Sequence, residues 1–145
     1  MKTLALIRLA WRITVGVTLF NAVTAVAGGV AIVLTGGLGM PASMLSNSSF
    51  DSFLWPGIIL VVIVGGTQLV AAVLTIARQS SAPLWVAVAG CSMVIWIFVE
   101  TVLIEGFSWL QGLYFATGLL QLILVIGILT AAARGNTAVF LMAQP

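Results

Sequence analysis

An ionisable carboxyl group inside an apolar segment is the feature of this sequence best suited to chemistry. Glu100 lies within the run from Ile95 to Tyr114, which consists mostly of aliphatic and aromatic residues. A charged side chain in hydrocarbon costs about 2.5–3.5 kcal/mol at the centre of a bilayer and less near its surface. Glu100 must therefore be protonated, paired or hydrated. It is a candidate site for a proton, a cation or a lipid headgroup, and structural anchoring is the competing interpretation.

Further polar and aromatic side chains fall at helical spacing around this carboxyl group. Trp96 precedes Glu100 by one helical turn, and Gln111 and Tyr114 follow in the next apolar segment. Counting about 1.5 Å of rise per residue places Glu100 and Tyr114 near one membrane surface. The same count predicts a second polar layer near the bilayer middle, formed by Asn21, Gln68 and Gln121. All of these side chains are candidate ligand-binding residues, and hydrogen bonding between helices is the competing interpretation of the middle layer.

The composition excludes several kinds of chemistry. The chain is 62% hydrophobic and only 6% charged, whereas about a quarter of the residues of a soluble domain are charged. Histidine is absent and Cys91 is the single cysteine, which removes His-based catalysis, bis-His haem and redox cysteine pairs. We therefore expect no catalytic residues, no metal and no cofactor, and the sequence favours a protein that is not an enzyme. Five basic residues are too few for a nucleic-acid surface.

Four apolar segments are long enough to carry these side chains across a membrane, since about 20 helical residues span the hydrocarbon core. They cover residues 13–34, 56–76, 84–104 and 110–132. The long connection 35–55 is expected at the outer surface or over the mouth of the bundle. Segments 1–12 and 137–145 are expected at the membrane interface, with Trp11 at headgroup depth.

Small and polar residues recur at near-heptad spacing along each segment and predict the inward faces. These stripes are Thr14, Thr18, Asn21, Ala25, Gly28 and Thr35; Val61, Gly65, Gln68, Ala72 and Thr75; Val86, Ala89, Met93, Trp96, Glu100 and Leu103; and Gln111, Tyr114, Gly118, Gln121 and Val125. Four stripes of one period favour a left-handed bundle. The predicted fold class is all-α, a single integral membrane domain built as a four-helix antiparallel bundle.

The distribution of charge predicts the orientation of this bundle. The basic residues are Lys2, Arg8, Arg12, Arg78 and Arg134. With four crossings they all fall on one side, and Asp51 and Glu105 fall on the other. Because Lys and Arg are retained in the cytoplasm, both termini are expected there. The expected location is the inner (plasma) membrane of a bacterium, as a multi-pass protein.

Several short stretches carry a resemblance to known membrane proteins. They are Leu54–Leu60, Val64–Gln68, Trp96–Glu100, Phe107–Gln111 and Tyr114–Phe115. With this pattern, residues 13–130 resemble a group of small uncharacterised four-helix bacterial membrane proteins. In size and layout the chain also resembles the DoxX-like group, some members of which are linked to thiol or quinone redox systems. Small multidrug transporters are similar in length and have a membrane glutamate in their first helix, whereas Glu100 lies in the third segment here.

Three functions remain compatible with these features. The favoured one is a non-enzymatic membrane protein that binds a lipid or an apolar small molecule, or that serves as the accessory subunit of a membrane complex. A proton- or cation-coupled transporter would use Glu100 as its titrating group and would need a homodimer. A redox accessory protein is the function that the DoxX-like resemblance implies. The expected partners are membrane lipids, a second copy of the chain or another membrane protein, and not nucleic acid.

Overall fold

The structure, a computed structural model, describes residues 2–103 and 108–135. Within these residues every regular element is helical, which confirms the predicted all-α class. The elements are α1 (Lys2–Thr35), the 3₁₀ helix η1 (Ala42–Leu45), α2 (Leu54–Ile59), the π-helix η2 (Leu60–Gly65), α3 (Gly66–Ile76), α4 (Ala82–Leu103) and α5 (Trp109–Gly135). Because α2, η2 and α3 follow one another without a break, they form one long helix.

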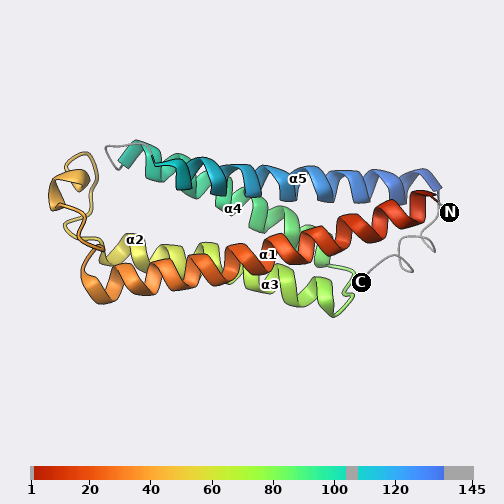
Figure 1. The fold of residues 1–145 in the computed structure, drawn as a ribbon, viewed down its shortest axis with the longest axis horizontal. Coiled ribbons are helices and arrows are strands. Elements are labelled where there is room, and N and C mark those ends of the chain that lie inside the picture. Colours follow the sequence, from red (N-terminus) through yellow and green to blue (C-terminus); the bar gives the residue numbers. More distant parts are fainter. Residues whose placement is uncertain (1, 104–107, 136–145) are drawn as a thin grey trace.

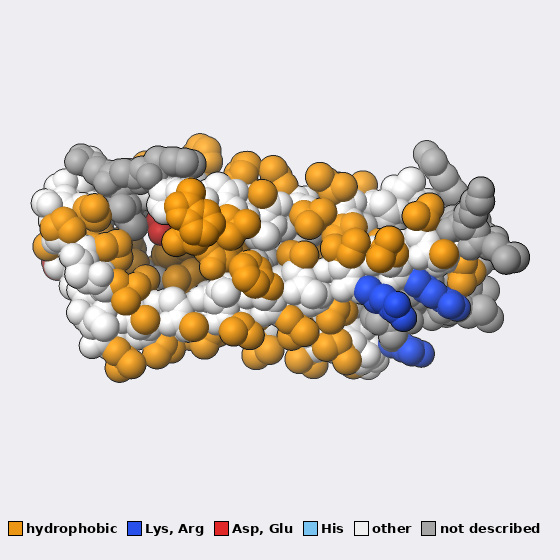
Figure 2. Space-filling model, in the orientation of Figure 1, with side chains coloured by type: hydrophobic (Ala, Val, Ile, Leu, Met, Phe, Trp, Pro, Cys, Tyr) orange, Lys and Arg blue, Asp and Glu red, His pale blue; other side chains and the backbone are white. Residues whose placement is uncertain are grey.

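Four long helices therefore lie side by side, and consecutive ones run in opposite directions (Figure 1). Each is long and apolar enough to cross a membrane over the ranges Leu4–Thr35, Leu54–Ile76, Ala82–Val102 and Trp109–Ala133. Hydrophobic side chains are spread along the whole length of the face drawn in Figure 2. The handedness of their packing stays a prediction.

The first helix begins earlier than the sequence led us to expect. Residues 2–12 continue α1 without a break, whereas we expected the helix to begin near residue 13. Trp11 is fully buried and packs in one cluster with Ile7, Ala82 and Ile128, and its headgroup depth stays a prediction, as does the interfacial position of residues 1–12. The reason is spacing, because Ile7 and Trp11 extend the inward stripe of Thr14 toward the N-terminus at intervals of three and four residues. The predicted interfacial segment 137–145 and Glu105 lie outside the described residues.

The four helices form two hairpins. The first hairpin is α1 with the helix α2–η2–α3, and the second is α4 with α5. In the first, a Cβ atom added to Gly29 would lie 2.7 Å from the carbonyl oxygen of Gly57. In the second, a Cβ atom added to Gly118 would lie 3.2 Å from the carbonyl oxygen of Gly90. Glycine thus permits the close backbone approach in both hairpins, as small residues do between membrane helices.

The second long helix contains a π-helical turn, where the sequence predicts a regular helix over 56–76. At its end the amide of Gly66 donates to the carbonyl of Val61, five residues earlier. Such a turn accommodates one extra residue and re-aims the side chains that precede it. Leu60, the first residue of this turn, lines the pocket described below.

The two hairpins meet closely at one end and diverge at the other. We call the end formed by residues 36–53 the loop end, and the end where α1 begins and α5 finishes the terminal end. Among the described elements, α3 packs against both α1 and α4, whereas α2 packs against α1. Figure 1 shows the ribbons of the two hairpins separating toward the loop end. Side chains fill part of the space between the separated hairpins, and the part that stays open is the candidate site.

Candidate functional site

A layer of amide side chains joins the two hairpins midway along the bundle. Gln68 of α3 and Gln121 of α5 donate to each other reciprocally, with N···O distances of 3.0 and 2.6 Å. The Gln68 amide also donates to the carbonyl of Ala89 on α4, at 3.2 Å. Both glutamines are fully buried. In a low-dielectric core such a closed pair satisfies groups that would otherwise be costly.

A second link in this layer connects α1 with α5. The hydroxyl of Thr117 donates to Oδ1 of Asn21 at 3.1 Å, and also lies 2.8 Å from the carbonyl oxygen of Tyr114. Asn21 is fully buried, and its Nδ2 has no hydrogen-bond partner. The glutamines of this layer therefore satisfy each other, whereas Nδ2 of Asn21 is a donor without a partner.

Toward the loop end the same helices enclose a pocket of about 460 Å³ between the two hairpins. It is lined by Thr24, Ala25, Gly28 and Ile32 of α1; by Leu38, Met40 and Met44 of the loop; by Leu60 of η2; by Met93, Trp96, Ile97 and Glu100 of α4; and by Ser108, Leu110, Gln111 and Tyr114 at the start of α5. Figure 2 shows a hollow near the left end of this long face, with an acidic side chain visible inside it. The volume falls within the range of small-molecule sites, about 300–1,000 Å³.

A backbone turn after α1 brings Leu38 into the pocket wall. Gly36 has φ of 68°, and the amide of Gly37 donates to the carbonyl of Ile32, which is a glycine-dependent helix stop. Leu38 also adopts a positive φ, 56°, and its amide donates to the Thr35 hydroxyl at 2.8 Å. A left-handed conformation is costly for leucine, so the fold holds this side chain in place against local backbone preference.

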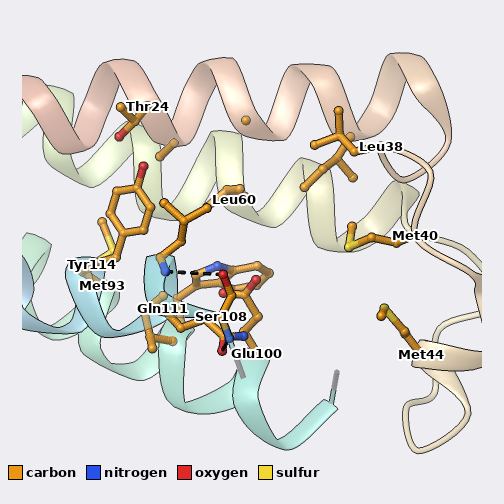
Figure 3. A pocket seen from close by; sticks show the side chains of 16 residues that line it. Thr24, Leu38, Met40, Met44, Leu60, Met93, Glu100, Ser108, Gln111 and Tyr114 are labelled. Atoms are coloured by element: carbon orange, nitrogen blue, oxygen red, sulfur yellow. Dashed lines mark hydrogen bonds between the residues drawn. The ribbon is translucent and has the colours of Figure 1, made fainter. Parts of the chain in front are cut away.

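The rest of the loop folds back over the pocket instead of extending into solvent. Leu45 and Phe53 are buried within the loop end, and the ring of Phe53 packs on Gly37. Met40 and Met44 lie on the side facing the pocket, as Figure 3 shows. Unbranched methionine side chains adapt to ligands of irregular shape.

An aromatic residue separates the pocket from the polar layer. The ring of Tyr114 stacks on Phe20 of α1, with ring centroids 6.2 Å apart and an interplanar angle of 22°. In Figure 3 its side chain extends across the pocket toward Thr24. The ring therefore links α5 to α1 immediately below the open space.

The N-terminus of α5 forms the wall beside Tyr114. The amide of Ser108 donates to Oε1 of Gln111 at 3.0 Å, and the amide of Leu110 donates to the Ser108 hydroxyl at 3.3 Å. This reciprocal arrangement is a capping box, which satisfies amides that the helix itself leaves unpaired. Gln111 thus has a structural role in the pocket wall, whatever else it binds.

Glu100 lies in the pocket without a counter-charge among the described residues. Its carboxyl group forms no ion pair or hydrogen bond within the described chain, and none of the residues lining the pocket is basic. Arg8 and Arg12 belong to the start of α1, and Arg78 precedes α4. Figure 2 shows basic side chains gathered toward the terminal end of this face. Glu100 lies near the C-terminal end of α4, about 27 Å along the helix axis from the first residue of that helix.

The candidate residues from the sequence thus divide into two groups. Trp96, Glu100, Gln111 and Tyr114 line the pocket, whereas Asn21, Gln68 and Gln121 lie in the layer beneath it and do not line it. A ligand-binding role for any of them stays a prediction.

Several residues of the site were not among the candidates. Thr117 holds Asn21, and its position three residues after Tyr114 on the inward face of α5 is a signal that spacing provides. Thr24 follows Asn21 by three residues and Ser108 has the capping-box spacing with Gln111, but neither spacing shows a place in the pocket, which depends on how the hairpins diverge. Within the described chain no cluster of residues suits a metal ion, and Cys91 is exposed on α4 away from the pocket.

No protein-family model matches the chain, and neither the curated proteins nor the solved structures contain a significant match.

Proposed function

We propose that this chain is a non-enzymatic integral membrane protein that binds a lipid or an apolar small molecule in the loop-end pocket. The observation that carries the proposal is the pocket itself, about 460 Å³ in volume and lined mainly by apolar and aromatic side chains. A few polar groups among such a lining are what a small-molecule site uses to orient its ligand. The glutamines beneath the pocket are bound to each other, which favours a site that ends at this layer over a continuous channel.

The proposed setting is the inner membrane of a bacterium. Four apolar helices of sufficient length support a multi-pass arrangement. The basic residues near the terminal end support a cytoplasmic location for both termini, which leaves the pocket near the outer surface. In this setting the protein acts as a ligand-binding module, alone or as the accessory subunit of a membrane complex.

Filling the pocket with a side chain tests this function. Gly28 lines the pocket, and a Cβ atom added there would meet only a Leu60 methyl group, at 3.9 Å. Gly28→Leu should therefore occupy the space without disturbing the helices. The matched control on the same helix is Gly16→Leu, because Gly16 is exposed and has no neighbour within 4 Å of an added Cβ atom.

The measurement is native mass spectrometry of each variant released from native-lipid nanodiscs, combined with thermal unfolding. We expect the wild type and Gly16→Leu to retain a bound lipid or small molecule that Gly28→Leu lacks, at similar unfolding temperatures. Identical ligand content in all three, with all three folded, would refute the proposed site.

A second candidate function is a proton- or cation-coupled transporter, and the observation that favours it is the unpaired carboxyl group of Glu100 inside the pocket. In proteoliposomes, Glu100→Gln would then abolish uptake driven by a pH gradient while leaving the fold intact. Uptake by the wild type that is indifferent to the gradient would exclude this function and leave the binding function standing.

A further inference from the structure

We infer that the ligand of the loop-end pocket is an amphipathic organic cation, whose ammonium group pairs with Glu100 and whose apolar body fills the space between the hairpins. The inference rests on the proposed binding function and specifies the chemical class of its ligand. Its first support is charge complementarity. Among the described residues that line the pocket, Glu100 is the acidic one and none is basic.

No ion pair or hydrogen bond within the described chain compensates a carboxylate at this position. In the adjacent wall, the amides of Ser108 and Leu110 at the N-terminus of α5 are already engaged in the capping box. Glu100 itself lies in the last turn of α4 (Ala82–Leu103). The helix macrodipole places partial negative charge at that end and so adds to the attraction for a cation.

Aromatic and sulfur-containing side chains complete a lining suited to such a ligand. Trp96 and Tyr114 line the pocket, and aromatic faces attract ammonium groups through their quadrupole. Met40, Met44 and Met93 provide apolar contacts that adapt to the shape of an alkyl or ring system. A neutral apolar ligand would use these surfaces equally well, but it would leave Glu100 without a partner in a desolvated site.

The position of the opening indicates where the ligand comes from. The hollow in Figure 2 lies on the long side of the molecule, which faces lipid in the proposed membrane setting. An amphiphile already inserted in the bilayer can therefore enter sideways, with its charged group at the depth of Glu100 near the membrane surface. Both a lipid with an amine headgroup and a free lipophilic amine have this chemistry.

Three probes of equal chain length separate charge from apolar burial. We would measure the binding of decyltrimethylammonium, decanol and decanoate to the full chain in nanodiscs of digalactosyldiacylglycerol, an uncharged lipid without an ammonium group, with empty nanodiscs subtracted. We expect the cation to bind at least about tenfold more tightly than the alcohol, the size of effect that about 1.4 kcal/mol from a charge pair produces. Decanoate should bind most weakly of the three.

Two carboxylate variants show whether Glu100 causes this preference. Glu100→Gln keeps the shape of the side chain and removes its charge, so the cation should lose about tenfold in affinity while decanol changes by less than about twofold. Asp51→Asn is the matched control, because Asp51 is exposed and does not line the pocket. The Asp51→Asn variant should prefer the cation over decanol by the same factor as the wild type.

The outcomes distinguish this inference from the function on which it rests. Equal binding of cation and alcohol, both abolished by Gly28→Leu, would overturn the cation while preserving the apolar-ligand site. A preference for the cation that persists in Glu100→Gln would also overturn it. If none of the probes binds in a manner sensitive to Gly28→Leu, the proposed function itself fails.

A change of lipid identifies the natural source of the ammonium group. Nanodiscs that contain phosphatidylethanolamine should weaken the binding of decyltrimethylammonium if a lipid headgroup is the ligand, since lipid and probe then compete for Glu100. Binding that is unaffected by this lipid supports a free lipophilic amine.

Discussion

The middle layer and the loop-end pocket are built from the same faces of the same helices, yet one is closed and the other open. In the middle layer Gln68 and Gln121 bond to each other across the two hairpins. One to three turns nearer the loop end, the corresponding faces of α4 and α5 present Glu100 and Tyr114 to an open space. Helical spacing therefore does not account for the difference.

The difference lies in which groups can satisfy one another. A carboxamide carries both donors and an acceptor, so two of them form a closed pair without outside help. An ionised carboxylate only accepts, and Glu100 has no described cation within reach. Polar groups that complement each other draw hairpins together, and a group without a complement is left for water or a ligand.

The largest expected change in unfolding free energy tests the close backbone contact within the first hairpin. Gly29→Ala would place a methyl group 2.5 Å from Val61 and 2.7 Å from the Gly57 carbonyl oxygen. Overpacking of this kind costs about 1–3 kcal/mol of unfolding free energy. Gly16→Ala on the same helix meets nothing within 4 Å and should stabilise the helix by about 0.5–1 kcal/mol. Thermal unfolding in detergent checks both, and equal effects would show that the close approach does not exist.

The next effect tests the closed layer directly. Gln121→Leu should lower the unfolding free energy by about 1–2 kcal/mol, because it leaves the Gln68 amide without its reciprocal partner. The double variant Gln68→Leu/Gln121→Leu removes both polar groups and should recover most of this loss. A double variant with the summed cost of both single ones would mean that the pair stabilises the bundle in its own right.

A smaller effect is expected at the unused donor of the same layer. Asn21→Leu loses the bond from Thr117 but also removes a buried Nδ2 that has no partner. The two contributions oppose each other, so the unfolding free energy should change by less than about 1 kcal/mol. A cost as large as that of Gln121→Leu would indicate that Nδ2 is satisfied by a bound water or ligand.

The smallest effect on stability concerns the pocket wall. Leu38→Gly removes about 1–2 kcal/mol of backbone strain from the folded state, because glycine adopts a positive φ freely. It also stabilises the unfolded state by about 0.5–1 kcal/mol through chain entropy, so the unfolding free energy should barely change. Decanol should bind about three- to tenfold more weakly, since one apolar wall is lost. Leu38→Ala is the control: it loses the same wall, keeps the backbone strain and should be the less stable of the two.

The spacing of small and polar residues in the sequence predicts much of the surface that is buried between the helices. The predicted stripes contain Thr14, Thr18 and Asn21 on α1 and Gln68, Ala72 and Thr75 on α3, and all of these are buried. They could be predicted because a helix repeats its face every three to four residues whatever its neighbours are. The start of α1 was missed because a Trp–Arg pair near a membrane surface also fits an interfacial anchor.

The pocket could be predicted only in part. Glu100, Trp96 and Tyr114 were found as unusual residues in apolar helices, and the apolar connection 35–55 was expected near the mouth of the bundle. The separation of the hairpins and the π-helical turn at Leu60–Gly65 have no strong local signal in the sequence. The turn at Leu38 does have one, in Gly36 and Gly37, but the spacing of residues within one helix does not record how two hairpins diverge.

The glycine contacts have a mechanical consequence. Backbones that touch at Gly29 and Gly57, and at Gly90 and Gly118, make each hairpin behave as a stiff arm. The arms are joined through the Trp11 cluster, the glutamine pair and a cluster nearer the loop end in which Ala25 and Val64 pack with Met93 and Ile97 of α4. The pocket lies between the two arms, so a small rotation of one arm against the other would change its width. We therefore expect a bound ligand to change the angle between the hairpins.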